Sequence, residues 1–441
     1  MTRSLEKSNQ HYKRADKQLP LGVSSNFRDW GPEQTIYLAR AKGARVWDLD
    51  DNEYIDYRLG YGPAILGHCD DRVDAAAREG IEIGGATGLS TVREAVVAER
   101  IKKMVSAADL VRFTNSGTEA VMAALRVARA FSGKDSHIMV EGGFHGLFDV
   151  SLWEIKPDED PAGRLEPDGA GVPELMRGLV NIVPLNDANR LEDMLKKRGD
   201  SIGAFIIEPI LGNAGSITAE EQYLKDARAL CDRFDVVMLI DEVKTGFRVA
   251  RGGVQELMDV RADLCTFAKA MGNGYPISAI AGREEIMRKI GGADGVAQGG
   301  TYAGHPVPLA AVEKTLEILD ETDTLEGIAD YGLRLQQGIS GILSHRGIAH
   351  VFSGHPSMGG LFFAESLPRN YREWATTDYE FYNSLALELN ELGILCEPDS
   401  REPWFISAAH DDACLAETLE KFEVALNTVL KRTSPAAANP G

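Results

Sequence analysis

The chain has 441 residues, 44% of them hydrophobic and 26% charged, which is an ordinary composition for a globular protein. This length exceeds what one hydrophobic core usually organises, so we expect two domains. The net charge of −20, from 67 acidic and 47 basic residues, argues against nucleic acid or an anionic membrane surface as a partner.

The five cysteines are scattered along the chain and form no C-x-x-C pair: Cys69, Cys231, Cys265, Cys396 and Cys414. Their odd number and their spacing predict a reducing, cytoplasmic compartment. We expect no membrane span and no signal peptide, because the N-terminal residues are polar and the apolar run 236–240 is far shorter than the roughly 20 residues that a span requires. The nine histidines show no H-x-x-x-H pattern, so the sequence predicts no metal site.

The first predicted element is a β-hairpin, with strands at 44–48 and 54–57 joined by a turn at 50–52. From about residue 70, helices alternate with short apolar strands. The helices are expected at 71–81, 91–104 and 117–131, and the strands at 110–114, 137–140, 204–207, 236–240 and 264–267. This alternation predicts a mainly parallel sheet with helices on both faces.

Residues 156–171 are rich in Pro, Gly, Asp and Glu and have no apolar period, so they predict a surface excursion near the site, either functional or a flexible insertion. Beyond residue 310 the predicted elements are helices at 309–319, 325–343 and 412–430 and strands at 357–363 and 404–407. We expect a large domain at 61–310, a smaller C-terminal domain at 311–432 that residues 1–60 join, and a disordered tail at 433–441.

An aspartate directly follows the predicted buried strand at 236–240. Asp241 therefore lies where open α/β sheets place their ligands. A buried carboxylate needs a positive partner or several hydrogen bonds. The alternative interpretation is an aspartate that only caps a helix or pairs in a salt bridge.

Lys269 stands between a β-rich run and a turn that contains Gly272, Gly274 and Pro276, so its ammonium group sits on a rigid stem. A single lysine in such a place is more often a solvated surface residue. Together with Asp241, however, it matches what pyridoxal phosphate (PLP) chemistry requires. A lysine forms the Schiff base with the aldehyde, and an aspartate keeps the ring nitrogen protonated.

Two segments are candidates for binding a phosphate group. Ser116, Gly117 and Thr118 open a helix after a strand, where free amides, hydroxyls and the helix dipole favour an anion. The alternative there is a capping box between Ser116 and Glu119, which needs no ligand. The second segment is residues 298–301, where two glycines precede Thr301. Bare glycine backbone next to a hydroxyl suits a phosphate oxygen, and the alternative is a plain turn.

With these residues assembled, the chain resembles the class III aminotransferases of PLP fold type I, and within them the branch that contains glutamate-1-semialdehyde 2,1-aminomutase. The resemblance runs over nearly the whole length and rests on motifs in a shared order: 39–48, 62–68, 114–120, 207–209, 240–248, 268–272, 300–301 and 406–410. It implies an α/β fold with a mainly parallel seven-stranded sheet in the large domain and a smaller α+β domain.

The resemblance also implies roles for individual residues. Lys269 would bind PLP and shuttle the proton, and Asp241 would pair with the ring nitrogen. The other implied cofactor contacts are Ser116, Gly117 and Thr118 at the phosphate, Phe144 and Val243 on the two ring faces, His145, Asn213 near the phenolic oxygen, Glu208 behind the ring, and Thr301 from the neighbouring subunit of a homodimer.

The reaction that we favour from the sequence is ping-pong transfer of an amino group from an amine or amino acid to a keto acid or aldehyde. Features of the aminomutase branch are residues 245–248, Arg28 and Glu402. Residues 150–161 replace the small-residue gating loop of those enzymes, which argues against intramolecular transfer. Racemisation and decarboxylation are further alternatives. A binding protein without catalysis would leave the Asp241 and Lys269 pair without a purpose.

The residues expected to contact the substrate are Arg28, Tyr61, Trp153 and Glu402. Arg28 would hold a substrate carboxylate, since a guanidinium group binds a carboxylate through two hydrogen bonds. A surface ion pair is the alternative for this arginine.

Overall fold

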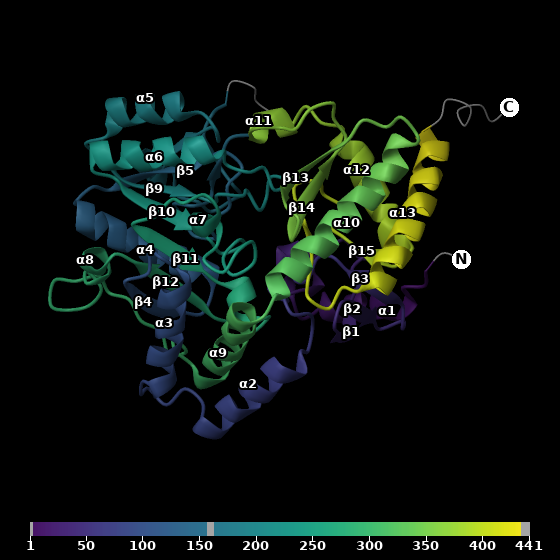
Figure 1. Cartoon of the computed structure of the whole chain (residues 1–441), viewed down its shortest axis with the longest axis horizontal. Helices are drawn as coiled ribbons and strands as arrows, with labels where there is room; N and C mark the ends of the chain where they lie inside the picture. Colours follow the sequence, from purple (N-terminus) through teal and green to yellow (C-terminus); the bar gives the residue numbers. More distant parts are fainter. Residues whose placement is uncertain (1–2, 157–162, 434–441) are drawn as a thin grey trace.

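A seven-stranded sheet lies at the centre of the larger half of the molecule (Figure 1). The computed structural model describes residues 3–156 and 163–433. The strand order is β4-β12-β11-β10-β9-β5-β8. The strands span Leu110–Thr114 (β4), Ser136–Val140 (β5), Val180–Val183 (β8), Ile202–Ile207 (β9), Val237–Asp241 (β10), Leu264–Phe267 (β11) and Ser278–Gly282 (β12).

Only β12 runs against its two neighbours in this sheet, while the other adjacent pairs are parallel. Side chains of successive residues point to opposite faces of a strand. Accordingly Val237 and Leu239 of β10 belong to one core cluster, whereas Met238 and Ile240 belong to another. The sheet is therefore buried on both faces, which explains why its central strands are continuous apolar runs.

Helices cover both faces of the sheet (Figure 1). α4 (Gly117–Ser132) packs across β9, β10, β11 and β12, and α6 (Glu221–Phe234) packs against β10. The remaining helices of this half are α2 (Asp71–Ile83), α3 (Val92–Met104), α5 (Ala188–Arg198), α7 (Val254–Leu257), α8 (Glu284–Met287) and α9 (Pro306–Glu321), with 3-10 turns η3 (Glu174–Leu179) and η4 (Lys269–Gly272). The predicted α/β architecture with a mainly parallel seven-stranded sheet is confirmed.

The smaller half contains two sheets. One has the order β1-β2-β3-β15 and the other β13-β14-β16. Their strands are β1 (Leu38–Lys42), β2 (Arg45–Asp48), β3 (Glu53–Asp56), β13 (Val351–His355), β14 (Met358–Phe362), β15 (Ile394–Leu395) and β16 (Trp404–Phe405). The helices are α1 (Glu6–Ala15), α10 (Thr324–Ser344), α11 (Tyr371–Trp374), α12 (Tyr379–Glu391) and α13 (Asp412–Thr433), and two further 3-10 turns are η1 (Pro20–Gly22) and η2 (Asn26–Arg28).

The expected hairpin near the N-terminus forms as β2 and β3, and β3 pairs in parallel with β15 from the C-terminal part of the chain. The segment at 150–171 forms a short hairpin of β6 (Trp153–Glu154) and β7 (Glu166–Pro167), and the part of it at 157–162 lies outside the described residues. The expected tail beyond residue 433 lies outside them as well. The domain boundaries at 60, 310 and 432 stay predictions.

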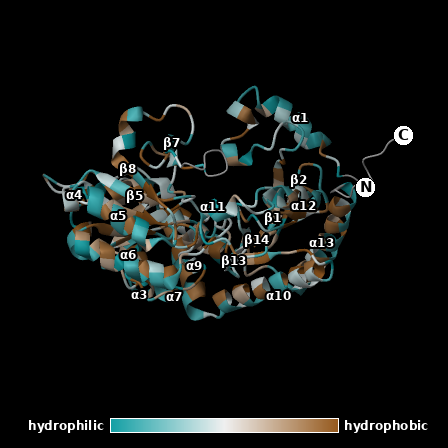
Figure 2. Cartoon of the chain, turned by 90° about the horizontal axis from the view of Figure 1, so that it is seen from above, coloured by the Kyte–Doolittle hydropathy of each residue, from teal (hydrophilic) through white to brown (hydrophobic). Residues whose placement is uncertain are grey.

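The sequence patterns did not predict several elements, among them α1, β1, β8, β12, β13, α12 and β15. α1 is polar throughout, is largely teal in Figure 2, and buries only Ser8 and Ala15. β12 is built from small residues, Ser-Ala-Ile-Ala-Gly, which carry little apolar signal although the strand is completely buried. Tertiary contacts, rather than local propensity, determine these elements.

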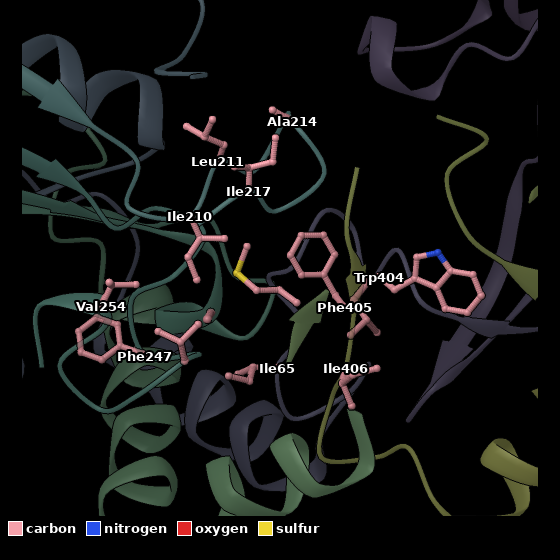
Figure 3. Close-up of a cluster of buried hydrophobic side chains, with 14 of the residues drawn as sticks. Ile65, Ile210, Leu211, Ala214, Ile217, Phe247, Val254, Trp404, Phe405 and Ile406 are labelled. Atoms are coloured by element: carbon pink, nitrogen blue, oxygen red, sulfur yellow. The ribbon is translucent and has the colours of Figure 1, made fainter. Parts of the chain in front are cut away.

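A hydrophobic cluster and one arginine join the two halves of the molecule. In Figure 3, Phe405 of β16 points toward Ile210 and its neighbours, and all of them belong to one core cluster. Arg248 is completely buried beside Phe405 and donates hydrogen bonds to three carbonyl oxygens, those of Ser357 (3.2 Å), Ile406 (2.9 Å) and Gly62. Burial without a carboxylate partner lowers the pKa of Arg248 to about 9.

No helix in the described part of the chain is long and apolar enough to cross a bilayer.

Candidate active site

Asp241 ends β10 at the carboxyl edge of the sheet, where parallel strands place their functional side chains. Its carboxylate is only 2% exposed and is surrounded by donors. Oδ2 lies 2.8 Å from Nδ1 of His145, and Oδ1 accepts hydrogen bonds from Thr266 Oγ1 at 2.9 Å and from the Val243 amide at 3.1 Å. These partners hold the carboxylate in one orientation. No described helix begins at Asp241, so it caps none, whereas its contact with His145 agrees with the alternative of a salt bridge.

Lys269 follows β11 on the neighbouring strand and begins the 3-10 turn η4. Its φ of +49° lies in the left-handed region, which is strained for a residue with a side chain and is found mostly at functional sites. Nζ has no hydrogen-bond partner among the described residues. Burial, followed by repulsion from Lys244, lowers the pKa of Lys269 to about 7, so much of this amine is neutral near pH 7.

The first turn of α4 faces this region. Ser116 is the N-cap residue and accepts a hydrogen bond from the Glu119 amide at 3.3 Å. The Glu119 carboxylate returns to the Asn115 amide at 2.9 Å instead of the Ser116 amide, so only half of the expected capping box forms. Ser116 is exposed, and Gly117 and Thr118 are partly exposed. Amides of this first turn therefore stay available to an anion.

Glycines bring the backbone of α4 close to two other loops. A Cβ added at Gly117 would lie 3.1 Å from Val243, and one at Gly146 would lie 2.6 Å from Thr118. Val243, two residues after Asp241, thus packs directly on the start of α4. This close approach forms a narrow cradle between the candidate phosphate-binding turn and the Asp241 carboxylate.

Glu208 is buried behind Phe144 and accepts hydrogen bonds from the Phe144 amide at 2.7 Å and the Gly212 amide at 3.2 Å. Burial raises the pKa of Glu208. Phe144 is partly exposed, and its ring meets that of Phe27 edge-on, with centroids 6.0 Å apart. Glu208 therefore fixes the loop that carries Phe144 and His145.

A cavity of about 380 Å³ opens beside these residues, which is large enough for a small substrate. Its wall combines aromatic and acidic side chains, and three of the four expected substrate residues, Tyr61, Trp153 and Glu402, lie on it. The acidic residues on the wall are Asp29, Glu154, Asp168, Glu397, Asp399 and Glu402. The 150–171 segment contributes Trp153, Glu154 and Asp168, so the part of this excursion that is described lies at the cavity as expected.

Two expected site residues lie elsewhere in this chain. Arg28 is exposed and does not line the cavity, although Phe27 and Asp29 on either side of it do. Thr301 is also exposed and lies outside the cavity, beside Gly300, which approaches the Asn115 side chain. The structure of a single chain thus brings neither residue to Lys269.

Thr266 and Lys244 also contact this site, although the sequence patterns did not point to them. Thr266 on β11 bonds to Asp241, and Lys244 pairs with Glu402 at 3.2 Å. The position of Lys244 could have predicted its role, because a lysine three residues after a buried strand is rarely buried itself unless it has a charged partner. No group of metal-binding side chains occurs among the described residues.

The arrangement fits PLP. The unbonded Lys269 amine suits its aldehyde, the oriented Asp241 carboxylate suits its ring nitrogen, and the first turn of α4 suits its phosphate. The backbone at Gly117 and Gly146 approaches Val243 and Thr118 this closely only because the two glycines lack a Cβ.

Comparisons with known proteins agree with this geometry. The family model "Aminotransferase class-III" matches residues 28–424. The chain is 41% identical over 425 residues to a glutamate-1-semialdehyde 2,1-aminomutase of Methanothrix thermoacetophila, covering 96% of this chain and 97% of that protein. It is 38% identical to a protein of that name from Thermus thermophilus, with 95% and 99% covered.

Solved structures show the same fold. An omega-transaminase from Sphaerobacter thermophilus superposes with a TM-score of 0.89 at 26% identity, with 96% of this chain and 97% of that chain covered. A transaminase with PLP bound gives a TM-score of 0.88 at 26% identity, with 98% and 99% covered. The chain therefore belongs to the class III aminotransferase family and is a PLP-dependent enzyme of fold type I.

Proposed function

We propose that the chain moves an amino group within a single substrate, converting glutamate-1-semialdehyde to 5-aminolevulinate. The observation that carries amino transfer is the placement of the unbonded Lys269 amine and the buried Asp241 carboxylate on adjacent strands of one sheet. Near-full-length relatives at 36–41% identity that carry the name glutamate-1-semialdehyde 2,1-aminomutase support the intramolecular reaction better than the intermolecular one that we favoured from the sequence.

PLP, when bound, supplies an electron sink that stabilises negative charge at the substrate carbon next to the nitrogen. Lys269 Nζ, once free, takes the proton from that carbon, which requires the neutral amine. Asp241, held by His145 and Thr266, keeps a proton at the ring nitrogen. Phe144 and Val243 would pack against the two ring faces, and the first turn of α4 would bind the phosphate.

A second candidate is transfer between two substrates, and the cavity wall gives it a specific observation. Among the described residues, six carboxylates and one cation, Arg401, line the cavity. Cations pair with four of these carboxylates, Arg401 with Asp399, Lys244 with Glu402, Arg58 with Glu397 and Lys156 with Glu154, which leaves an excess of negative charge at the wall. Such a wall favours a substrate that carries a positive charge over one that carries a carboxylate. A protonated amine that donates its amino group in the first half of the reaction and then leaves would be such a substrate.

Incubation of the purified enzyme with glutamate-1-semialdehyde, in the absence of any added amine, distinguishes the two candidates. Formation of 5-aminolevulinate over many turnovers supports the intramolecular reaction. If product stops after one equivalent, or if turnover needs an added amine donor, the intermolecular reaction holds. If neither occurs and Lys269→Ala still converts the substrate, amino transfer at this site is wrong.

We also propose that two copies of the chain associate. Large apolar side chains are exposed at the C-terminal end of α2 (Ile81 and Ile83), in the loop after it (Leu89, 80% exposed) and at the first residue of α3 (Val92, 83% exposed). Exposed apolar groups of this kind usually mark an interface. Thr301 would then reach the phosphate site of the other copy. Equilibrium sedimentation tests this, and a chain that stays monomeric at micromolar concentration while active would contradict it.

A further inference from the structure

A second lysine, Lys244, lies behind the wall of the cavity in the loop that follows β10. Its side chain is 6% exposed, and its ammonium group makes three hydrogen bonds: to the Gly212 carbonyl at 2.6 Å, to Asn213 Oδ1 at 2.9 Å and to Glu402 Oε2 at 3.2 Å. A lysine has three donors, so every one of them is used. This satisfies a charge that would be costly to bury alone.

The partners of Lys244 are themselves linked. Asn213 Nδ2 donates to Glu402 Oε1 at 2.7 Å, so the carboxylate binds the lysine through one oxygen and the amide through the other. The amide can therefore point in only one direction. Asn213 and Glu402 line the cavity, whereas Lys244 does not, so any effect of Lys244 on a ligand passes through these two side chains.

The chain makes room for this lysine at Gly212. A Cβ added there would lie 2.1 Å from Cδ of Lys244 and 2.9 Å from Oε2 of Glu208. Contacts this short do not occur between real atoms, so no other residue fits at 212 while Lys244 keeps its position. Glycine at 212 and lysine at 244 thus form one packing unit.

Lys244 also affects Lys269 through its charge. The charged groups that face Lys269 are Lys244, Glu402, Glu208 and Asp241. After burial itself, repulsion from Lys244 is the largest cause of the lowered pKa of Lys269, and it exceeds the opposing effect of Glu402. Placing a lysine next to another cation is a general way to obtain a neutral amine near pH 7.

We propose that Lys244 is a positioning residue for amino transfer, whose buried ammonium group holds Asn213 and Glu402 in place at the cavity wall. This proposal rests on the proposed role of Lys269. It predicts that the pKa of Lys269 rises when the positive charge at 244 is removed and falls when the negative charge at 402 is removed.

The test measures the acidity of Lys269 directly in the full chain freed of PLP. Trace acetylation with acetic anhydride at a series of pH values, followed by mass spectrometry of the Lys269 peptide, gives the fraction of neutral amine. Lys244→Met removes the cation with little change in shape. We expect acetylation of Lys269 at pH 7 to slow about fivefold, which is the loss of neutral amine when a pKa of about 7 rises by about one unit. Glu402→Gln removes the anion, and acetylation should become faster.

Lys244→Arg is the matched control, because it keeps the charge, and its acetylation profile should stay close to that of the unaltered chain. In the double variant Lys244→Met/Glu402→Gln, the rate should lie between those of the unaltered chain and Lys244→Met. The proposal is overturned if Lys244→Met leaves the profile unchanged, or if Lys244→Arg slows acetylation as much as Lys244→Met does, since packing and not charge would then control Lys269.

A second measurement detects loss of folding and failure of the proposed function separately. Far-ultraviolet circular dichroism must show the same helix content in all variants before the profiles are compared. In the enzyme loaded with PLP, the pH dependence of kcat should move to higher pH in Lys244→Met and not in Lys244→Arg. If Lys269→Ala remains active, the proposed function is wrong. The acetylation rates of the variants would still show whether Lys244 changes the pKa of Lys269.

Discussion

The carboxylate of Asp241 and the imidazole of His145 meet at 2.8 Å, and both side chains are almost wholly buried, at 2% and 1% exposed. Nε2 of His145, on the other side of the ring, has no hydrogen-bond partner among the described residues. The resemblance placed His145 among the cofactor contacts, but its observed contact is with Asp241. His145 therefore orients the Asp241 carboxylate, and we propose that the remaining acceptor capacity of this carboxylate serves the PLP ring nitrogen.

Replacement of Asp241 tests the role of this carboxylate. Asp241→Asn keeps the shape but removes the negative charge, so the ring nitrogen would lose its proton. We expect kcat to fall by about 10² to 10³, the usual cost of losing one preorganised electrostatic group. Thr266→Ser is the control, since it keeps the hydroxyl that bonds to Asp241. Equal loss in both variants would point to disruption of the strand rather than to the charge.

Lys269 should be the residue to which PLP is attached. Reduction of the loaded enzyme with borohydride, followed by digestion and mass spectrometry, should place the added mass on the peptide that contains Lys269. Lys269→Ala should abolish turnover, whereas replacement of the exposed Lys289 by alanine should leave it intact. Label on another lysine would contradict the proposed site.

The lowered pKa of Lys269 has a consequence for stability. Between pH 7 and 10.5 the unfolded chain holds a proton on this amine that the PLP-free folded chain lacks, so the free energy of unfolding rises with pH in this window, by at most about 1.4 kcal/mol per pH unit. Lys269→Met has no such group. Its stability advantage over the unaltered chain should be largest near pH 7 and shrink toward pH 9, as measured by urea unfolding without PLP. A constant difference between the two chains would show that this pKa is not lowered.

Gly146 should be needed for PLP binding, because it lets its loop pack closely against the first turn of α4. Gly146→Ala would place a methyl group 2.6 Å from Thr118, in a backbone conformation with φ of +98°. We expect affinity for PLP to fall by at least about tenfold, which equals about 1.4 kcal/mol. Gly133→Ala is a matched control, because Gly133 also has a positive φ, +69°, but has open space around it. Fluorescence titration with PLP measures both, and equal affinities in the two variants would contradict the prediction.

Arg248 should be required for stability rather than for binding PLP. Arg248→Met removes a donor from three buried carbonyl oxygens, of which, within the described part of the chain, only that of Ser357 keeps another, the Ile406 amide at 3.0 Å. We expect the free energy of unfolding to fall by about 3 kcal/mol. Arg288→Met, at an exposed pair with Glu284, should cost less than about 1 kcal/mol. Urea unfolding of the two variants provides the comparison. If Arg248→Met loses no more free energy of unfolding than Arg288→Met does, Arg248 does not stabilise the contact between the two halves.

The sequence predicts the central strands well, because a strand that is buried on both faces is mostly apolar, as residues 237–240 of β10 are. It does not predict β15, whose two residues become a strand only because β3 offers them an open edge. The strand-end positions of Asp241 and Lys269 could be predicted for the same reason as the strands themselves.

The wall of the cavity is harder to predict, since it combines segments that are distant in sequence. Phe27 comes from the N-terminal part, Trp153 from the excursion and Glu402 from just before β16. Phe27 reaches the wall although Arg28 was expected there, because one step along the backbone turns the side chain in another direction. The link from Lys244 to Glu402 spans 158 positions and no local pattern contains it.

The pairing of Ile55 with Ile394 has a consequence for how the protein is made. The N-terminal strands leave the ribosome first, yet the edge of β3 stays open until almost the entire polypeptide has been translated. The α/β core around β10 can assemble in the meantime from segments that are close in sequence. Contacts between such distant segments form slowly, so completion of the smaller half would be the late step of biosynthesis.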